Sequence, residues 1–238
     1  MTPTPPRQSL ALVIGAGGGL GAALVQRLSA DAEHHVLALG RSSHPAIDYT
    51  DEASLRRAAD WVAGQCAAQH ADLRLLVVAS GFLHGEQGQP ERSWSHLDAD
   101  YLSHVFRINT IGPALVMKHF LPLLPKQGRC VAVFVSAKVG SIGDNALGGW
   151  YGYRASKAAL NQLVKTASIE LARRNSQAVC VALHPGTIDT ALSQPFAKTG
   201  LNVRPAAEAA NDLLAVLTSL SSAQTGALVD YQGQTLPW

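Results

Sequence analysis

The sequence carries little charge for its length. Asp, Glu, Lys and Arg make up 15% of the 238 residues, whereas about a quarter is usual for soluble domains. Nineteen basic and seventeen acidic side chains leave a net charge of +2, and no run of like charge occurs. This balance argues against a nucleic-acid-binding surface. Because 47% of the residues are hydrophobic, most of the chain is predicted to form a sizeable core.

Cysteine is also scarce, with only Cys66, Cys130 and Cys180 present. Their odd number and wide spacing predict buried free thiols in a reducing compartment. The nine histidines form no HExxH motif and no Cys/His cluster, so no metal site is expected. No apolar run approaches the ~18 residues that a membrane span needs, and the N-terminus lacks a secretory apolar segment. We therefore expect a cytoplasmic protein with no membrane or nucleic-acid partner.

One stretch carries a pair of side chains suited to proton transfer. Residues 148 to 163 read GGWYGYRASKAALNQL, and apolar residues at helical spacing continue beyond them. Tyr153 and Lys157 are therefore predicted to share one face of a helix. Because a nearby ammonium favours an ionised phenol, we expect Lys157 to lower the pKa of Tyr153 and Tyr153 to act as a general acid/base. An ordinary solvated helix face remains the alternative at this point.

An apolar strand, residues 10 to 14, runs directly into the glycine-rich loop GAGGGLG and then into a helix-like segment. This order is typical of a dinucleotide-binding turn. Gly15 would permit the tight turn, Gly17 to Gly19 would let backbone N–H groups approach a pyrophosphate, and Gly21 would let the helix pack closely. A flexible connection between two elements is the alternative.

A second strand, residues 36 to 39, ends in Gly40-Arg41-Ser42. An acid at this place commonly binds the ribose of NAD, whereas an arginine accommodates the 2′-phosphate of NADP. Arg41 therefore favours NADP(H), although an exposed loop arginine would look the same.

The remaining pattern predicts the fold class. Further strands are expected at residues 73–79, 131–135 and 178–183, with short strands at 47–49 and 228–230, and helices at 51–70, 100–120 and 205–220. This alternation indicates an α/β fold, a doubly wound Rossmann-type parallel sheet of six to seven strands with helices on both faces. Ligands of such sheets bind beyond the carboxyl ends of the strands, where the candidate residues fall. We expect a flexible arm at residues 1–8 and a single domain at 9–238.

Together these motifs resemble the short-chain dehydrogenase/reductase superfamily over residues 9–238. GSIGDNALGGWYGYRASKAALN and LHPGTIDTALSQPF are most similar to its C-factor and sniffer type of carbonyl reductase. The resemblance implies hydride transfer from NADPH to an aldehyde or ketone, with Tyr153 as proton donor and Lys157 on the nicotinamide ribose. Pro113 would free the Asn109 carbonyl, which in the family holds a relay water. The implied cofactor-binding residues are Gly15, Gly18, Gly19, Leu20, Arg41, Ser42, Asp48, Tyr49, Ala79, Ser80, Gly81, Tyr153, Lys157, Pro185, Gly186 and Thr187.

The chain departs from the family pattern at the hydroxyl that orients the substrate carbonyl. The catalytic serine of the family aligns with Ala137. Ser136 is the nearest hydroxyl and the first choice for this role, and Ser141 is the reserve. The Asn-Asn-Ala-Gly segment of the family is also altered, since residues 79 to 81 read Ala-Ser-Gly.

These departures favour a second interpretation, a dinucleotide-binding signalling or regulatory protein with vestigial catalysis. The retained Tyr153 and Lys157 disfavour it, because binding alone needs no ionisable phenol. The resemblance also implies a homodimer or homotetramer built through the helices that begin near residues 101 and 153. Residues 141–151 are expected to form a pocket wall lined by Leu147 and Trp150, and residues 188–204 a mobile lid.

Overall fold

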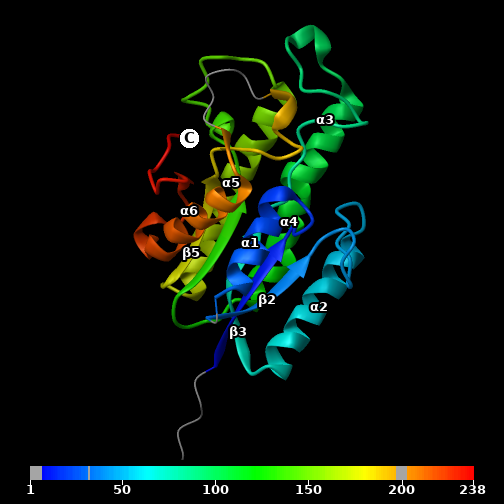
Figure 1. The fold of residues 1–238 in the computed structure, drawn as a ribbon. Helices are drawn as coiled ribbons and strands as arrows, with labels where there is room; N and C mark the ends of the chain where they lie inside the picture. Colours follow the sequence, from blue (N-terminus) through cyan, green and yellow to red (C-terminus); the bar gives the residue numbers. More distant parts are fainter. Residues whose placement is uncertain (1–6, 32, 197–202) are drawn as a thin grey trace, which may run out of the picture.

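The computed structural model describes residues 7–31, 33–196 and 203–238. Its centre is a six-stranded sheet in which every pair of neighbouring strands is parallel, in the order β2-β1-β3-β4-β5-β8 (Figure 1). This is the predicted doubly wound α/β fold. The strands are β1 (Gln8–Ile14), β2 (His34–Leu39), β3 (Ala71–Val78), β4 (Cys130–Val135), β5 (Ala178–His184) and β8 (Leu228–Asp230).

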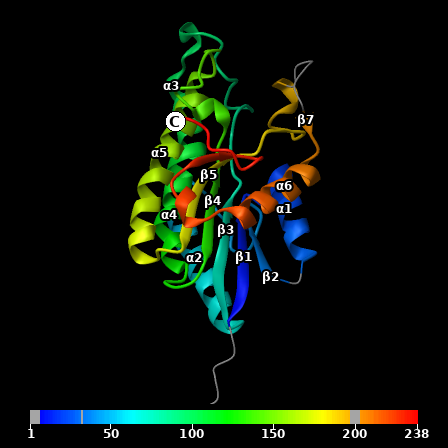
Figure 2. The ribbon, with the colours of Figure 1, turned by 90° about the vertical axis from the view of Figure 1, so that its left-hand side faces the viewer.

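Helices cover both faces of the sheet (Figure 2). One face carries α1 (Gly19–Ser29) and α6 (Ala206–Ser219), and the other carries α2 (Glu52–Ala68), α3 (Ala99–Phe106), α4 (Gly112–Phe120) and α5 (Tyr151–Arg174). Central strands covered on both sides bury nearly all of their residues except at the strand ends, which is why β1, β4 and β5 read as continuous apolar runs. Alternate residues of these strands enter two separate hydrophobic clusters, one on each face.

Two predicted elements differ in the structure. Ile47 to Tyr49 form no strand. The next strand, β3, was expected to be the fourth along the chain and is therefore the third. The helix expected over residues 100–120 is divided by a π-helical turn, Arg107–Ile111. The predicted interruption at Asn109 is therefore present. It is a single π-helical turn that directly precedes α4, the helix that contains Pro113.

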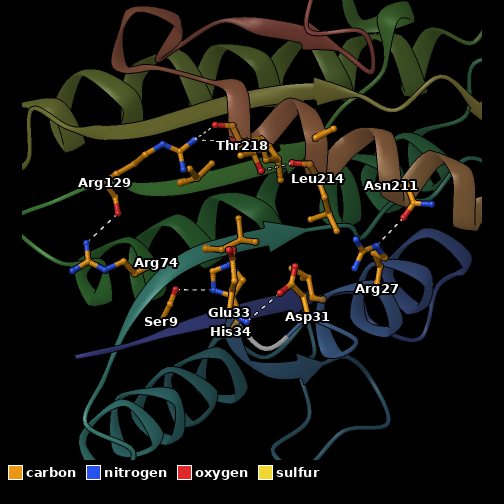
Figure 3. A pocket seen from close by; sticks show the side chains of 15 residues that line it. Ser9, Arg27, Asp31, Glu33, His34, Arg74, Arg129, Asn211, Leu214 and Thr218 are labelled. Atoms are coloured by element: carbon orange, nitrogen blue, oxygen red, sulfur yellow. Dashed lines mark hydrogen bonds between the residues drawn. The ribbon is translucent and has the colours of Figure 1, made fainter. Parts of the chain in front are cut away.

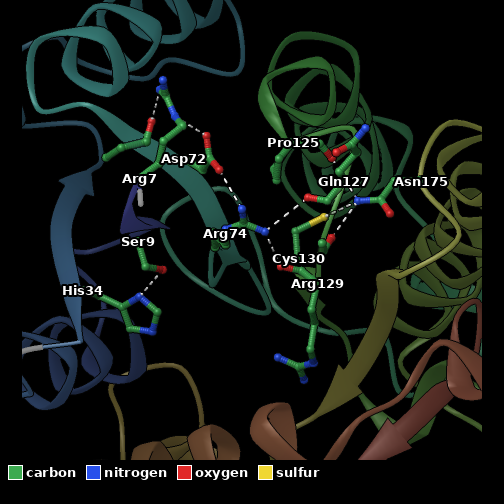
Figure 4. Close-up of polar contacts among 12 residues, drawn as sticks. Arg7, Ser9, His34, Asp72, Arg74, Pro125, Gln127, Arg129, Cys130 and Asn175 are labelled. Atoms are coloured by element: carbon green, nitrogen blue, oxygen red, sulfur yellow. Dashed lines mark hydrogen bonds and ion pairs between the residues drawn. The ribbon is translucent and has the colours of Figure 1, made fainter. Parts of the chain in front are cut away.

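The predicted flexible arm is wrong for its last two residues. Arg7 Nε donates to Asp72 Oδ1 at 2.6 Å, and Gln8 is the first residue of β1, in register with Ala71 of β3 (Figure 4). An ion pair and strand pairing therefore hold this segment to the sheet. Residues 1–6 of the arm lie outside the described part of the chain.

A hollow of about 600 Å³ lies at the amino-terminal edge of the sheet, beside α1 and α6 (Figure 3). Its three arginines each donate to another part of the protein. Arg27 donates to Asn211 at 3.0 Å (Figure 3) and Arg74 to the Arg129 carbonyl at 3.1 Å (Figure 4). Arg129 donates to the Leu220 carbonyl at 3.0 Å. These bonds join α1 to α6, the start of β3 to the start of β4, and the start of β4 to the end of α6. The chemistry predicted from the sequence belongs to the opposite edge.

No helix in the part of the chain that the structure describes is long and apolar enough to cross a membrane.

Candidate active site

A cavity of about 530 Å³ opens beyond the carboxyl ends of β1, β3, β4 and β5. Parallel strands present their carboxyl ends at one edge of a sheet, so loops far apart in the sequence meet there. Most of the predicted site residues line this one cavity: Gly18, Gly19, Leu20, Arg41, Ala79, Ser80, Gly81, Ser136, Tyr153, Lys157, Pro185, Gly186 and Thr187. The cavity is therefore the candidate active site.

Tyr153 and Lys157 lie in the first turns of α5, both buried and both facing the cavity. The predicted common face is confirmed, since the Lys157 ammonium nitrogen lies 5.9 Å from the centre of the Tyr153 ring. Lys157 Nζ also donates to the Val135 carbonyl at 2.9 Å. This bond fixes the ammonium at the end of β4, beside the phenol.

The prediction that Lys157 lowers the pKa of Tyr153 is wrong. Burial raises the pKa of Tyr153 to about 12 and lowers the pKa of Lys157 to about 8. Desolvation disfavours both charged forms, and here it outweighs the attraction between them. A phenol with a raised pKa stays protonated at neutral pH, which suits a proton donor.

Lys157 leads to a prediction for the pH dependence of the carbonyl reduction that the family resemblance implies. If its ammonium holds the cofactor ribose and polarises Tyr153, kcat/KM is constant at neutral pH and falls above pH ~8, by about tenfold per pH unit. Lys157→Arg keeps the charge at higher pH and should move this break beyond pH ~10. Initial rates of NADPH oxidation across the pH range test this. A break at the same pH in both proteins would assign it to another group.

Asn109 is fully buried in the π-helical turn and braces two walls of the site. Its side-chain oxygen accepts from the Phe82 N–H at 2.8 Å, and its amide nitrogen donates to the Phe82 carbonyl at 2.8 Å and to Ser156 Oγ at 3.1 Å. Ser156 Oγ in turn donates to the Tyr153 carbonyl at 2.8 Å. Asn109 does not line the cavity, and its carbonyl as a relay for protons stays a prediction.

The glycines at the cavity wall leave room for a ligand to approach the backbone. A Cβ on Gly81 would lie 3.7 Å from Asn109 Oδ1 and 3.8 Å from Lys157 Nζ, directly over the polar centre. A Cβ on Gly19 would lie 2.7 Å from Cγ2 of Thr190, so a side chain there would close the gap between the glycine loop and the segment after β6 (Thr187–Ile188). A dinucleotide fits a wall of this kind.

Four predicted cofactor residues lie away from the cavity. Gly15 turns the chain beneath it, with φ +89°, and Ser42 is exposed on the following loop. The Asp48 carboxylate accepts from Thr50 N–H at 2.8 Å and from its hydroxyl at 2.7 Å, which lowers the pKa of Asp48. Tyr49 is buried with its hydroxyl 2.7 Å from Ser80 Oγ. The two residues act within the structure as a loop cap and as support for Ser80.

Neither serine considered for the carbonyl-orienting role presents a free hydroxyl to the cavity. Ser136 Oγ donates to Asn161 Oδ1 at 2.6 Å, and both side chains are buried. Ser141 is fully buried, does not line the cavity, and accepts from the Asp144 N–H at 3.1 Å. The side chain at the family's serine position, Ala137, does line the cavity. The role of Ser136 stays a prediction.

The wall expected at residues 141–151 is formed by Trp150 but not by Leu147, whose side chain is 91% exposed. Leu147 belongs to a turn that projects from the surface, and the prediction for it is wrong. Trp150 packs edge-on to Tyr153 and to Phe196, with ring centres 6.1 and 5.2 Å apart. Phe196 brings the expected lid segment to the cavity mouth. Residues 197–202 of that segment lie outside the described residues, and its motion stays a prediction.

Glu91 supports the site and was not predicted. It is 2% exposed, and both oxygens of its carboxylate accept from the Gly152 N–H at 3.1 Å. The Glu91 backbone carbonyl accepts from the Trp150 N–H at 2.6 Å. Trp150 is the N-cap of α5 and supplies no side-chain cap, so Glu91 caps the helix that carries Tyr153. It lies in an irregular polar segment with no periodicity that could have indicated this.

Replacing Glu91 tests this cap. Glu91→Leu leaves the Gly152 N–H without an acceptor and should destabilise the fold by ~1–3 kcal/mol. Because Tyr153 follows Gly152, turnover should fall as well. Glu91→Gln keeps an acceptor oxygen and should match the wild type in melting temperature and rate. Equal losses of melting temperature and rate in the two variants would mean that the cap depends on the negative charge of Glu91 and not on its acceptor oxygen.

Among the residues that the structure describes, no group of His, Cys, Asp and Glu could hold a metal ion. Cys130 and Cys180 are buried free thiols and Cys66 is a partly buried one, close to expectation.

Comparisons with known proteins identify the family of the chain. A family model described as short chain dehydrogenase matches residues 9–201. C-signal of Myxococcus xanthus is 36% identical over 143 residues, which span 59% of this chain and 82% of that protein.

Two solved structures have the same architecture. The NADPH-bound carbonyl reductase from chicken fatty liver matches with a TM-score of 0.83 and 27% identity over 98% of this chain and 100% of that one. Carbonyl reductase Sniffer of D. melanogaster matches with a TM-score of 0.83 and 23% identity over the same shares, 98% and 100%. The second likeness is a likeness of fold alone.

Proposed function

The chain belongs to the short-chain dehydrogenase family of oxidoreductases, and we propose that it is an NADPH-dependent reductase of aldehydes or ketones. One observation carries the proposal. Tyr153 and Lys157 are buried side by side at the wall of the cavity, which the glycine loop and the Pro185-Gly186 turn also line. Binding a dinucleotide does not require a buried phenol beside an ammonium, whereas proton transfer to a carbonyl oxygen uses a positioned acid of this kind.

The roles proposed for the side chains are those that the family resemblance implies. A nicotinamide cofactor, when bound, would supply hydride to the carbonyl carbon. Tyr153 gives its hydroxyl proton to the carbonyl oxygen, and its raised pKa keeps that proton in place at neutral pH. Lys157 would bond the nicotinamide ribose, Thr187 would bond the nicotinamide amide, and the Asn109 carbonyl would hold a relay water. Ser136, the hydroxyl chosen from the sequence, would have to turn from Asn161 to act on the substrate.

NADP(H) is the proposed cofactor. The backbone of Gly18, Gly19 and Leu20 would hold the pyrophosphate at the amino end of α1. Arg41 is exposed, lines the cavity, and is free to meet a 2′-phosphate at its rim. The chicken carbonyl reductase to which the chain is similar was solved with NADPH bound, which supports this choice.

Arg41→Asp tests the cofactor preference. Loss of the guanidinium should lower kcat/KM for NADPH roughly 10- to 100-fold, as expected for one charge-assisted contact, and leave that for NADH equal or higher. Arg56→Asp is the matched control, since Arg56 is exposed on α2 and does not line the cavity. Equal preference in all three proteins would mean that Arg41 does not meet the phosphate.

The activity itself is tested by NADPH absorbance with a panel of aldehydes and ketones. The proposal expects turnover with some members of the panel and none without a carbonyl compound. The alternative is a dinucleotide-binding signalling protein, which the identity to C-signal favours. That alternative expects NADPH to bind, detected by quenching of protein fluorescence, with no oxidation by any member of the panel.

We also propose a homodimer or homotetramer that associates through the helices α3 to α5. Ile111 and Ile169, on or next to these helices, are 38% and 48% exposed. Light scattering on the purified chain gives the oligomeric state, and a monomer at micromolar concentration would exclude this assembly.

A further inference from the structure

The part of the cavity around Tyr153 is apolar. Tyr153 packs in a hydrophobic cluster whose other members come from separate segments and also line the cavity: Leu83, Ala137, Val139, Trp150, Leu192 and Phe196. Lys138 lines the cavity too, but its ammonium forms an ion pair with Asp144 at 3.3 Å. Among the described residues, the other lysine and arginine at the wall are Lys157 and Arg41, both proposed to meet the cofactor. The space beside Tyr153 therefore suits an apolar part of a substrate.

Trp150 has the largest side chain of this cluster and lies directly beside Tyr153. Its indole is edge-on to the Tyr153 ring and to the Phe196 ring, with ring centres 6.1 and 5.2 Å apart. Trp150 is only partly buried, so some of its ring surface stays accessible in the cavity that it lines. Such a ring can bind another aromatic ring through apolar contact area and through edge-on or offset packing.

The backbone of Trp150 is strained. Its φ is +54°, in the left-handed region, and among the described residues other than glycine only His70 shares a positive φ. A bulky side chain in this conformation is a clear outlier, and the surrounding structure must offset its cost in free energy. Strain of this kind is concentrated at sites where function depends on one orientation of a side chain.

Contacts with two other segments hold this conformation. The Trp150 N–H donates to the Glu91 carbonyl at 2.6 Å. The Arg154 guanidinium donates to the Gly148 carbonyl at 3.1 Å and to the Gly149 carbonyl at 3.0 Å. Both glycines have a positive φ as well, 64° and 65°. The turn before Trp150 is thus bound to α5, the helix that carries Tyr153, and the indole is fixed relative to the phenol.

We propose that Trp150 determines which carbonyl compounds react, because its indole binds an aryl ring attached to the substrate carbonyl. The inference rests on the proposed reductase function and adds a substrate class to it, aryl aldehydes and aryl ketones. Trp150 takes no part in the transfer of the hydride or of the Tyr153 proton. Arg154 is a positioning residue, since it holds the turn before Trp150 and does not line the cavity.

The test compares benzaldehyde with propanal in the wild type, Trp150→Ala and Trp150→Phe. The readout is the ratio of kcat/KM for benzaldehyde to kcat/KM for propanal, because a change in this ratio between proteins cancels the different reactivities of the two aldehydes. Trp150→Ala should lower the ratio by ~10- to 100-fold, the effect of losing one large apolar contact. Trp150→Phe keeps an aromatic ring and should lower it by less than about fivefold.

Trp94→Ala is the matched control, since Trp94 is 78% exposed and does not line the cavity. It should leave the ratio unchanged. The loss in Trp150→Ala should arise mainly from a higher KM for benzaldehyde, as expected for a contact made equally in the bound substrate and in the transition state. The NADPH dissociation constant should change by less than about threefold. Where Trp150→Ala does not fold, Trp150→Gly replaces it, because glycine adopts a positive φ without strain.

Arg154→Met tests the positioning role. Methionine cannot donate to the Gly148 and Gly149 carbonyls, so the ratio should fall by about 3- to 10-fold. Added to Trp150→Ala, the same substitution should change the ratio by less than about twofold, because Arg154 acts on the substrate only through Trp150.

Several outcomes would overturn the proposal. A ratio that changes by less than about threefold in Trp150→Ala means that Trp150 only supports the fold, since a structural defect lowers both rates alike. An equal fall in Trp94→Ala, or an equal effect of Arg154→Met with and without Trp150, leads to the same conclusion. So does a wild type that reduces propanal but no aryl carbonyl. Absence of NADPH oxidation with every carbonyl compound would instead overturn the reductase function itself.

Discussion

Tyr153→Phe is expected to lower carbonyl reduction by ~10³-fold or more. The substitution removes one oxygen from a side chain that is 7% exposed and leaves the ring that packs against Trp150. The carbonyl oxygen would then have to take its proton from water, and a positioned acid contributes ~10²–10⁴ to such a step. No hydrogen bond within the described protein depends on the Tyr153 hydroxyl, so the melting temperature should not fall. Rates of NADPH oxidation with an active carbonyl compound measure the loss.

Tyr151→Phe is the matched control on the same helix. Tyr151 lies in the first turn of α5, is 36% exposed, and does not line the cavity. It should keep full activity, and both variants should bind NADPH with the affinity of the wild type. If Tyr153→Phe and Tyr151→Phe reduce carbonyls equally well, Tyr153 is not the acid. Binding without turnover in the wild type would instead favour the signalling interpretation.

The sequence predicted the site well where the candidate residues directly follow the ends of strands. Continuous apolar runs located β1, β3, β4 and β5, and parallel order then required their carboxyl ends to meet. Helical spacing alone placed Tyr153 and Lys157 on one face. These predictions depend on periodicity and topology, which a sequence carries directly.

Side-chain partners were predicted less well, because they depend on contacts between distant segments. Glu91 meets Gly152 across 61 residues, and Asn161 meets Ser136 across 25. Neither pair shares a motif. The direction of the Tyr153 pKa was also wrong, since a helix face shows which charges are near but not how deeply the pair is buried. Burial is a property of the folded chain.

The glycine loop depends on two close approaches that only glycine allows. Gly21 lies in the first turn of α1, and a Cβ there would lie 2.1 Å from the Gly15 carbonyl oxygen and 2.8 Å from its carbon. Both are backbone atoms directly after β1, so neither can move without shifting the turn. Gly15 itself has φ +89° and lies under Ser80, where a Cβ would be 2.7 Å from the Ser80 nitrogen. The loop is thus held from two sides.

Gly21→Ala is therefore expected to destabilise the fold by ~3 kcal/mol or more, the upper end of the cost of overpacking. For a chain of this size the melting temperature should fall by roughly 6–12 °C. Gly64→Ala is the control: Gly64 lies within α2, a Cβ there meets nothing within 4 Å, and alanine should stabilise that helix by ~0.5–1 kcal/mol. NADPH binding should weaken only in Gly21→Ala, because the displaced turn carries the backbone proposed to hold the pyrophosphate. Melting temperatures that move in the same direction for both variants would contradict this account of the loop.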